Sequence, residues 1–294
     1  MSLLAGLSTT LGAAVVFLLP GRQPTPSQMA FTLSLAAGVM LSVTLLEFWL
    51  PILSGGRDPG PVVFFSLLGA AAFLALSFVV PEADMEGISS GAADVEHGCA
   101  EKAVKGVGSH EHSIFGRARD DARYAEKNSD AEESGDTDLL RRTRGARLAF
   151  VLMLSLTAHN FPEGFAVAIS ANQDKRTGLL VMFAIAVHNI PEGIAIAVPV
   201  LAATDSKYRA LMMSLLSGMA EPVGAASALL MLRFGGGLGE KGMDNLLCVV
   251  GGTMCAVAAK ELLPEALRQG DILTVTGGVG LGFLIMAMTS WLGA

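Results

Sequence analysis

Long apolar runs, each long enough to cross the hydrocarbon core of a bilayer, recur from one end of this chain to the other. A helix needs roughly 17–25 residues for that crossing. Helices are the default because lipid offers the backbone no hydrogen-bond partner. Membrane barrels need short strands of alternating polarity, and these runs do not alternate. The sequence therefore predicts an all-α, polytopic membrane helical bundle.

Composition supports the same fold class. Apolar residues make up 52% of the 294 residues and charged residues only 16%, whereas a soluble domain carries about 25% charged residues. Proline and glycine punctuate the ends of the runs, as they do the ends of helices. We expect eight transmembrane helices: Leu3–Leu19, Gln28–Leu50, Val62–Val80, Ala146–Ala171, Gly178–Val200, Ala210–Phe234, Asn245–Leu263 and Ile272–Leu292.

A polar segment at residues 82–143 separates the third expected helix from the fourth. It is rich in charged residues, glycine and serine, and such a segment cannot bury enough apolar surface to offset its ordering entropy. We predict a long disordered loop there. The expected parts of the chain are therefore helices 1–3 in residues 1–81, the charged loop in 82–143, and helices 4–8 in 144–294.

The basic residues suggest an orientation for the bundle. Eight spans put both termini on one face, and the loop lies on the other. The loop ends in a basic cluster, Arg141, Arg142, Arg144 and Arg147. The positive-inside rule then predicts a cytoplasmic loop and extracytoplasmic termini, in the plasma membrane or an organellar membrane. We see no pattern for nucleic-acid binding, and the expected surroundings are the lipid bilayer.

Two hexapeptides in the fourth and fifth spans nearly repeat each other: HNFPEG at residues 159–164 and HNIPEG at 188–193. On a helix, residues four apart share a face, so His159 lies beside Glu163 and His188 beside Glu192. Asn160 and Asn189 are neighbours of the same glutamates, three residues away. Two such helices facing each other would bring imidazole, amide and carboxylate groups into one small volume.

Those groups suit a divalent first-row cation. Imidazole and carboxylate bind Zn²⁺ and also suit Fe²⁺ and related metals. The repeats contain no thiolate, which favours release over permanent binding. Pro162 and Pro191 each free a backbone carbonyl one turn back, and interrupted helices often mark the binding site of a transporter. A third acid, Glu221, also lies within a span, where ionisable groups are functional by default.

A single histidine in a membrane helix is more often a satisfied interhelical donor than a metal ligand, but two copies of this motif plus a third acid argue against that interpretation. Two other classes stay open. One is a metal-dependent intramembrane enzyme, although the HExxH pattern of common zinc proteases is missing. The other is a membrane metal sensor that binds without flux.

At these hexapeptides the sequence resembles the ZIP family of divalent metal transporters, and closely its bacterial-type and chloroplast-type branches. The resemblance implies a path that carries Zn²⁺, and in some members Fe²⁺, Mn²⁺ or Cd²⁺, into the cytoplasm as substrate, with no prosthetic group. It also implies pseudo-symmetry between the first and last three helices, and a homodimer. It implies a first metal position with His159, Glu163, His188, Glu192 and Met40, and a second with Asn160, Asn189 and Glu221, bridged by Glu163 and Glu192.

Two features depart from the family pattern or fall outside it. Family members often carry His-Glu on the exit side of the seventh span, where this chain has Lys260-Glu261. A salt bridge of Lys260 is the alternative to a metal role for Glu261. The loop holds His97, His110 and His112, which either bind metal weakly or belong to a solvated polar segment.

Overall fold

The computed structural model describes residues 1–19, 23–79, 114–235 and 239–293. The chain divides into two compact units, Met1–Val80 with Gly145–Ala294, and Pro81–Arg144. The first unit holds the two hexapeptides and all of the side-chain contacts described below. The described part of the second contributes helical backbone from Ile114, the first residue of α6.

The described residues are helical throughout the first unit, and no strand occurs among them. Their helices are α1 (Ser2–Ala13), α2 (Pro26–Val43), α3 (Leu50–Ser54), α4 (Pro59–Val79), α6 (Ile114–Gln173), α7 (Lys175–Thr204), α8 (Lys207–Gly218), α9 (Ala220–Arg233), α10 (Glu240–Val257), α11 (Leu263–Gln269) and α12 (Ile272–Gly293). Three short turns of other helix types extend them: η1 (Ala14–Phe17), η2 (Thr44–Trp49) and η3 (Ala258–Leu262).

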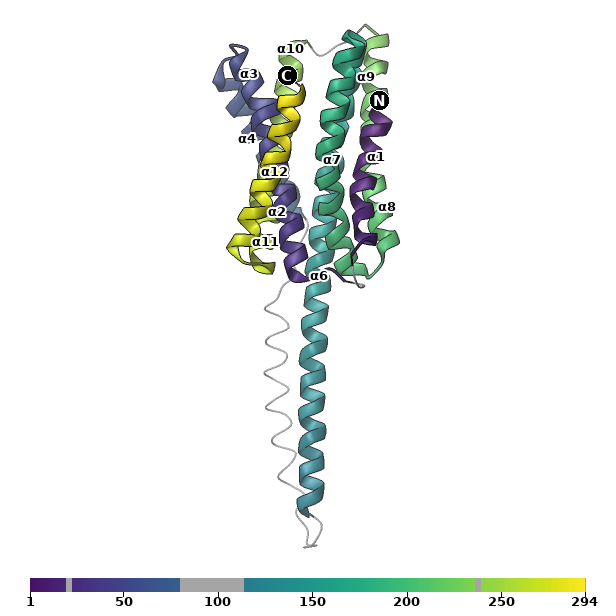
Figure 1. The fold of residues 1–294 in the computed structure, drawn as a ribbon, viewed down its shortest axis with the longest axis vertical. Helices are drawn as coiled ribbons and strands as arrows, with labels where there is room; N and C mark the ends of the chain where they lie inside the picture. The colour runs from purple at the N-terminus through teal and green to yellow at the C-terminus, as the bar shows by residue number, and fades with distance from the viewer. Residues whose placement is uncertain (20–22, 80–113, 236–238, 294) are drawn as a thin grey trace. The chain divides into compact units, whose positions relative to one another are not determined.

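These helices confirm the predicted fold class. Six helices of the described chain are long and apolar enough to cross a membrane, and Ser2–Phe17 forms a shorter apolar helix. The remaining expected span, residues 146–171, is the C-terminal part of α6. Both termini lie toward the same end of the first unit, as an even number of crossings requires (Figure 1).

The long segment between α4 and the fourth span is only partly described. Residues 80–113 lie outside the described residues, so the predicted disorder is not tested there. From Ile114 onward the backbone is helical as part of α6, which begins well before the span that we expected at residue 146. Alanine, glutamate and arginine, all good helix formers, are frequent in that stretch.

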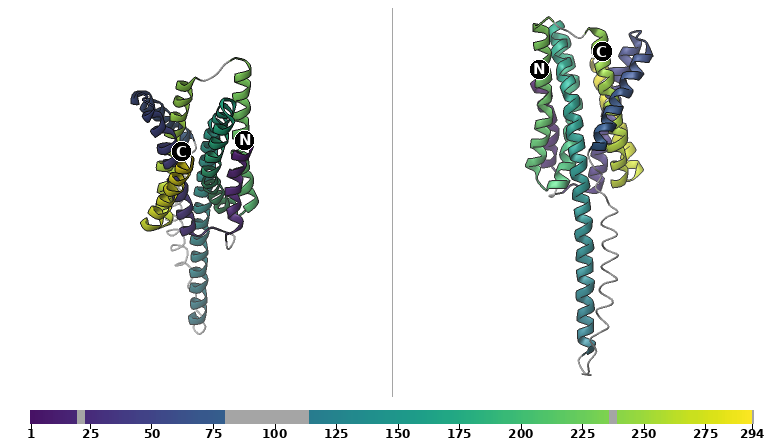
Figure 2. Two further views of the ribbon diagram at one scale, coloured as in Figure 1. Left: turned by 45° about the horizontal axis from the view of Figure 1, so that its top comes forward. Right: turned by 180° about the vertical axis from the view of Figure 1, so that it is seen from behind.

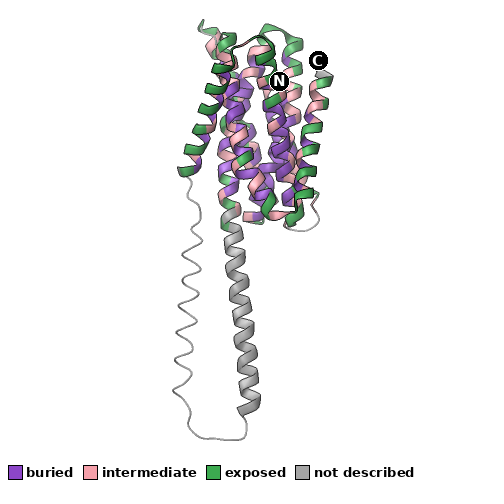
Figure 3. Ribbon diagram, turned by 90° about the vertical axis from the view of Figure 1, so that its left-hand side faces the viewer, coloured by how far each residue is buried: buried purple, intermediate pink, exposed green. Residues whose placement is uncertain are grey.

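The helices fall on two sides of a central seam. In both views of Figure 2, α1, α8 and α9 lie with α7 on one side, and α4, α10 and α12 lie on the other. Helix α2 packs against α12 and also against α7, so it joins the two sides. Buried residues concentrate where the helices meet, whereas α4 is exposed along much of its length (Figure 3).

Proline acts differently at different places. Helices α6 and α7 continue through Pro162 and Pro191, so our expectation of interrupted helices there is wrong. The helical turns on both sides of each proline keep the helix continuous. The sixth span does break, between α8 and α9 at Met219. Pro222 explains this break, because its ring clashes with the carbonyl four residues back, at Gly218.

Two π-helical turns were not foreseen from the sequence. Turn η2 contains Glu47 and is followed by Pro51; turn η3 contains Glu261 and is followed by Pro264. A π-turn admits one extra residue, which relaxes the clash that each proline would otherwise cause. Single π-turns inside α-helices are frequent at functional sites.

Close packing of α7 against α1 depends on a small residue. A Cβ added at Gly193 would lie 1.8 Å from the carbonyl oxygen of Thr9. The missing side chain lets the two backbones touch directly beside Glu192.

The start of α7 is fixed by Asp174, whose carboxylate accepts a 2.8 Å hydrogen bond from the Thr177 backbone N–H. That bond holds the pKa of Asp174 below its usual value.

Candidate metal centre

The two hexapeptides face each other inside the bundle. His159, Asn160 and Glu163 come from α6, and their counterparts come from α7. All of these side chains are at most 2% exposed: His159, Asn160, Glu163, His188, Asn189 and Glu192. Helices α6 and α7 are joined by the short connection at Asp174, and the i, i+4 spacing turns the histidine and glutamate of each helix toward the other helix.

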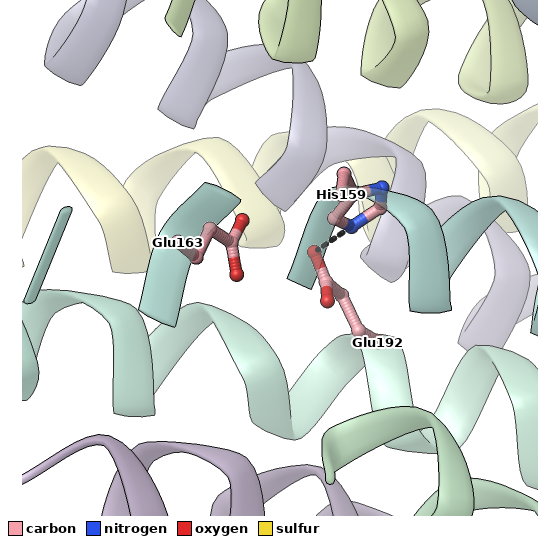
Figure 4. Close-up of side chains that lie close together, drawn as sticks. All are labelled: His159, Glu163 and Glu192. Atoms are coloured by element: carbon pink, nitrogen blue, oxygen red, sulfur yellow. Dashed lines mark hydrogen bonds and ion pairs between the residues drawn. The ribbon is translucent and has the colours of Figure 1, made fainter. Parts of the chain in front are cut away.

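Each histidine contacts the glutamate of the other repeat. His159 Nε2 lies 3.2 Å from Glu192 Oε1, and His188 Nε2 lies 3.4 Å from Glu163 Oε1. Figure 4 shows Glu192 reaching from α7 to His159, with Glu163 one helical turn further along α6. Ligand atoms of His159, Glu163 and Glu192 all lie within 4.8 Å of one another. This reciprocal pairing brings together four of the residues in the predicted first metal position.

A second polar group adjoins this cluster and includes Glu221. Asn189 Nδ2 donates hydrogen bonds to Glu221 Oε1 and, at 3.2 Å, to the carbonyl oxygen of Ala5. Asn160 Nδ2 donates to the carbonyl oxygen of Ser217 at 3.4 Å. Glu221 is fully buried in the first turn of α9. Both asparagines therefore use their amide nitrogens on neighbouring helices and leave their amide oxygens for other partners.

Several buried atoms of the two groups have no hydrogen-bond partner among the described residues. Apart from the ion-paired Glu163 Oε1 and His188 Nε2, they are His159 Nδ1, His188 Nδ1, Asn160 Oδ1, Glu163 Oε2, Asn189 Oδ1, Glu192 Oε2 and Glu221 Oε2. Five of these seven atoms are carboxylate or amide oxygens, which are acceptors that a cation would satisfy. Leaving such groups unpaired in an apolar interior costs about 1–3 kcal/mol each. A buried cluster with this many acceptors fits a site that receives a positive ion.

Met40 occupies a different helix from the repeats. It is fully buried on α2, and α2 packs against α7. A thioether on α2 would have to approach the repeats where α2 packs against α7.

The neighbouring residues Lys260 and Glu261 make contacts that we did not expect. Arg147 Nη1 on α6 lies 3.2 Å from Glu261 Oε2 in η3. Lys260 instead places its Nζ beside Ser77 Oγ and 5.0 Å from the centre of the Phe78 ring. One sequence signal pointed to Arg147 as a partner of Glu261: Arg147 is the basic residue at the start of the fourth span. His97, His110 and His112 of the loop lie outside the described residues.

Comparison with known proteins identifies the family. The profile of the family described as ZIP Zinc transporter matches residues 1–290. The zinc transporter ZupT of Clostridium perfringens is 30% identical over 98% of this chain and 93% of its own length. ZupT of Escherichia fergusonii is 30% identical over 98% of the chain and 94% of its own length. ZupT of Stenotrophomonas maltophilia strain K279a is 32% identical, over 99% and 95% respectively.

These relatives and the apolar helices show an integral membrane protein that transports a divalent metal, with zinc as substrate. They confirm the prediction of a transporter and not an enzyme. The chain belongs to the ZIP family of zinc transporters.

Proposed function

We propose that this protein carries Zn²⁺ into the cytoplasm through a two-metal site formed by the paired hexapeptides. The first metal would be held by His159, Glu163, His188 and Glu192, with Met40 as a fifth ligand. The second would be held by Asn160, Asn189 and Glu221, with Glu163 and Glu192 bridging the two. Imidazole also suits Fe²⁺, carboxylate suits Mn²⁺, and a thioether suits a soft ion such as Cd²⁺, so these three ions are the expected competitors.

The observation that carries the proposal is the reciprocal pairing of the two repeats. His159 meets Glu192 at 3.2 Å and His188 meets Glu163 at 3.4 Å, so four ligands of the right kind already converge. Zn²⁺ prefers imidazole and carboxylate at about 2.0–2.2 Å. Asn160, Asn189 and Glu221 each have one buried oxygen without a partner among the described residues. Asn189 donates to Glu221, and Asn160 is the neighbour of His159 on α6. This arrangement supports a second metal position beside the first.

The proposed direction follows from charge. The basic cluster before the fourth span supports a cytoplasmic loop and extracytoplasmic termini. Metal would enter from the side of the termini, exchange its water for the buried ligands and leave as the bundle rocks about the seam that α2 and α7 share. A homodimer, implied by the family resemblance, is a separate proposal that crosslinking in native membranes tests.

The test is uptake of Zn²⁺ into liposomes that hold the purified protein, with Fe²⁺, Mn²⁺ and Cd²⁺ added as competitors. The variants Glu163→Ala and His188→Ala each remove one converging ligand. Loss of a group that only orients a metal ligand costs about 10–100-fold, so loss of a ligand should reduce saturable uptake at least that much. Glu240→Ala is the matched control, because Glu240 is an exposed glutamate at the start of α10.

Three outcomes separate the alternatives. Saturable uptake that is lost in both variants and kept in the control supports the site. Normal uptake in Glu163→Ala, with the helical content unchanged, would exclude this assignment of ligands. Tight Zn²⁺ binding without any flux would support a membrane metal sensor instead.

A further inference from the structure

Glu47, in turn η2 of the second span, is an acid that the proposed metal centre does not use. Its chain neighbours Leu45, Leu46 and Phe48 are apolar. Its Oε1 atom is buried and has no hydrogen-bond partner among the described residues. An ionisable group inside a membrane span is costly and marks a functional site by default. This oxygen therefore needs a donor or a cation that the described residues do not supply.

Glu47 lies between the metal centre and the end of the bundle where the termini are. It is seven residues before Ser54, where the helical run Pro26–Ser54 ends, or about 10 Å along the axis at 1.5 Å per residue. His188 is thirteen residues after Lys175, the first residue of α7, or about 20 Å from that end. Both the end of the run, at α3, and the start of α7 lie toward the same end of the first unit as the termini (Figure 1).

The Glu47 carboxylate lies close to the paired repeats, although it comes from a different helix. Besides Glu163 and Glu192, Glu47 acts electrostatically on His188. The contact between the two segments has a simple origin, because α2, which leads into η2, packs against α7. His188 in turn lies 3.4 Å from Glu163. Glu47 is thus one step away from the predicted first metal position.

Glu47 differs from the side chains of the repeats in its exposure. It is partly exposed, whereas His188 and Glu163 are at most 2% exposed. Ionisable side chains within spans face the bundle interior or a water-filled cavity, and not acyl chains. We therefore expect the exposed part of this carboxylate to meet water on the side of the termini. A hydrated ion from that side would reach Glu47 before it reached the buried histidines.

We propose that Glu47 is an entry ligand for the transported divalent cation, which its carboxylate binds before His188 and Glu163 receive it. A negative charge at the mouth of a low-dielectric path raises the local concentration of cations. One carboxylate holds Zn²⁺ less firmly than a full set of imidazole and carboxylate ligands, so the ion can move on to the centre. This inference rests on the proposed function and adds a binding step before the two-metal site.

The liposome uptake assay tests the entry role with Glu47→Gln and Glu47→Asp. Glutamine keeps the size of the side chain and loses its charge, whereas aspartate keeps the charge. Charge focusing changes association rates by about 10-fold or more, so we expect Glu47→Gln to raise the KM for Zn²⁺ about 10-fold and to leave the maximal rate near that of the parent. Glu47→Asp should keep a KM close to that of the parent.

Two controls belong to that assay. Glu240→Gln removes the same charge from an exposed residue at the start of α10 and should leave KM unchanged. The rise in Tm caused by Zn²⁺ reports binding at the centre without transport. It should be kept in Glu47→Gln, because the ligands of the centre are intact, and reduced in Glu163→Ala.

Thiol labelling checks the position of Glu47 and does not rely on flux. Glu47→Cys in liposomes should react with a water-soluble, positively charged methanethiosulfonate reagent, and added Zn²⁺ should slow the reaction. Leu50→Cys is the matched control, since Leu50 is apolar and 53% exposed, so its position faces acyl chains and should not react. The parent protein, which has three cysteines, gives the background rate.

Three results would overturn the entry role. The first is an unchanged KM in Glu47→Gln when Glu163→Ala has lost uptake. The second is loss of the Zn²⁺-induced rise in Tm in Glu47→Gln, which would make Glu47 a ligand of the centre itself. The third is labelling of Glu47→Cys no faster than the background. Failure of the proposed function looks different: the parent would then show no saturable uptake, or Glu163→Ala would retain it.

Discussion

At the scale of single residues, the two asparagines of the candidate metal centre fix neighbouring helices with their amide nitrogens and leave their amide oxygens for another partner. Asn189 ties α7 to α9 through Glu221 and to α1 through the Ala5 carbonyl. Asn160 ties α6 to α8 through the Ser217 carbonyl. Their amide nitrogens are thus engaged by protein, and their oxygens stay free for a cation. An amide can do both tasks at once, whereas a carboxylate cannot donate.

Replacing Asn189 with aspartate should therefore separate stability from metal binding. The variant Asn189→Asp loses the donor to Glu221 and adds a second buried acid, so the metal-free protein should melt at a lower temperature. The extra charge should also increase the rise in Tm caused by Zn²⁺. Thermal melting with a chelator and with Zn²⁺ measures both effects.

Asn245→Asp is the control for that change. Asn245 Oδ1 accepts a 3.0 Å hydrogen bond from Arg57, so an aspartate there keeps its partner and should leave the metal-free Tm nearly unchanged. An equal loss of Tm in both variants would contradict the role given to the Asn189 amide.

Acid should slow uptake, for a reason that also lies in individual residues. A protonated imidazole has no free nitrogen lone pair, and a protonated carboxyl group has lost the negative charge that attracts the metal, so protons compete with Zn²⁺ for His159, His188 and the glutamates. We expect uptake at constant free Zn²⁺ to fall as the outside pH drops from about 7.5 to about 5.5, the range in which histidine usually changes charge. Rising uptake over that range would mean that protons drive transport.

The residues of the candidate site could be proposed from the sequence, but the pairing that the structure shows among them could not. The spacing of the repeats alone placed His159 beside Glu163, because that relation is local to one helix. The contact of His159 with Glu192, and the bond from Asn160 to the Ser217 carbonyl, depend on how α6, α7 and α8 pack. Arg147 was missed as the partner of Glu261 for the same reason, since the two residues are far apart in the chain.

At the scale of helices, glycine decides how closely α4 and α10 approach. A Cβ at Gly69 would lie 1.9 Å from the carbonyl oxygen of Val249. Gly69→Ala must therefore push two backbones apart, and overpacking of this kind costs about 1–3 kcal/mol. We expect a lower free energy of unfolding in detergent, measured by thermal or denaturant-induced loss of helical signal.

Gly280→Ala is the matched control on α12. A Cβ there would meet no heavy atom of the described chain within 4 Å, and alanine favours a helix over glycine by about 0.5–1 kcal/mol. This variant should be slightly more stable than the parent. Destabilisation of the same size in both variants would show that glycine at position 69 serves flexibility and not close packing.

The helices were predicted well where a long run of apolar residues marks them in the sequence. The spans around α2, α4, α7, α10 and α12 follow directly from their hydropathy. The turns η2 and η3 did not follow, because a π-turn depends on relief of a local clash near Pro51 and Pro264 that hydropathy does not record. Pro162, Pro191 and Pro222 look alike in sequence, yet only the last accompanies a break.

At the scale of the whole bundle, the ion pair of Arg147 with Glu261 joins α6 to η3, on the α10 side of the seam. The two side chains are 16% and 7% exposed, so the pair lies in a largely buried environment. Breaking a buried pair typically costs about 3–5 kcal/mol. We expect Arg147→Ala to reduce the free energy of unfolding by a comparable amount.

A double-mutant cycle with Glu261→Ala checks this assignment. The double variant should lose less stability than the sum of the two single losses, because the interaction is removed only once. Strict additivity would mean that the pair contributes nothing to holding α6 and η3 together.

In the candidate metal centre each histidine lies against the glutamate of the opposite repeat, so two contacts cross the proposed path between α6 and α7. A hydrated sodium or potassium ion would have to separate both contacts and shed its water, and imidazole offers these ions little in return. A transition metal gains bonds to the same nitrogen and oxygen atoms that it separates. The transporter should thus conduct little sodium or potassium, and the membrane that holds it should keep its gradients of both ions.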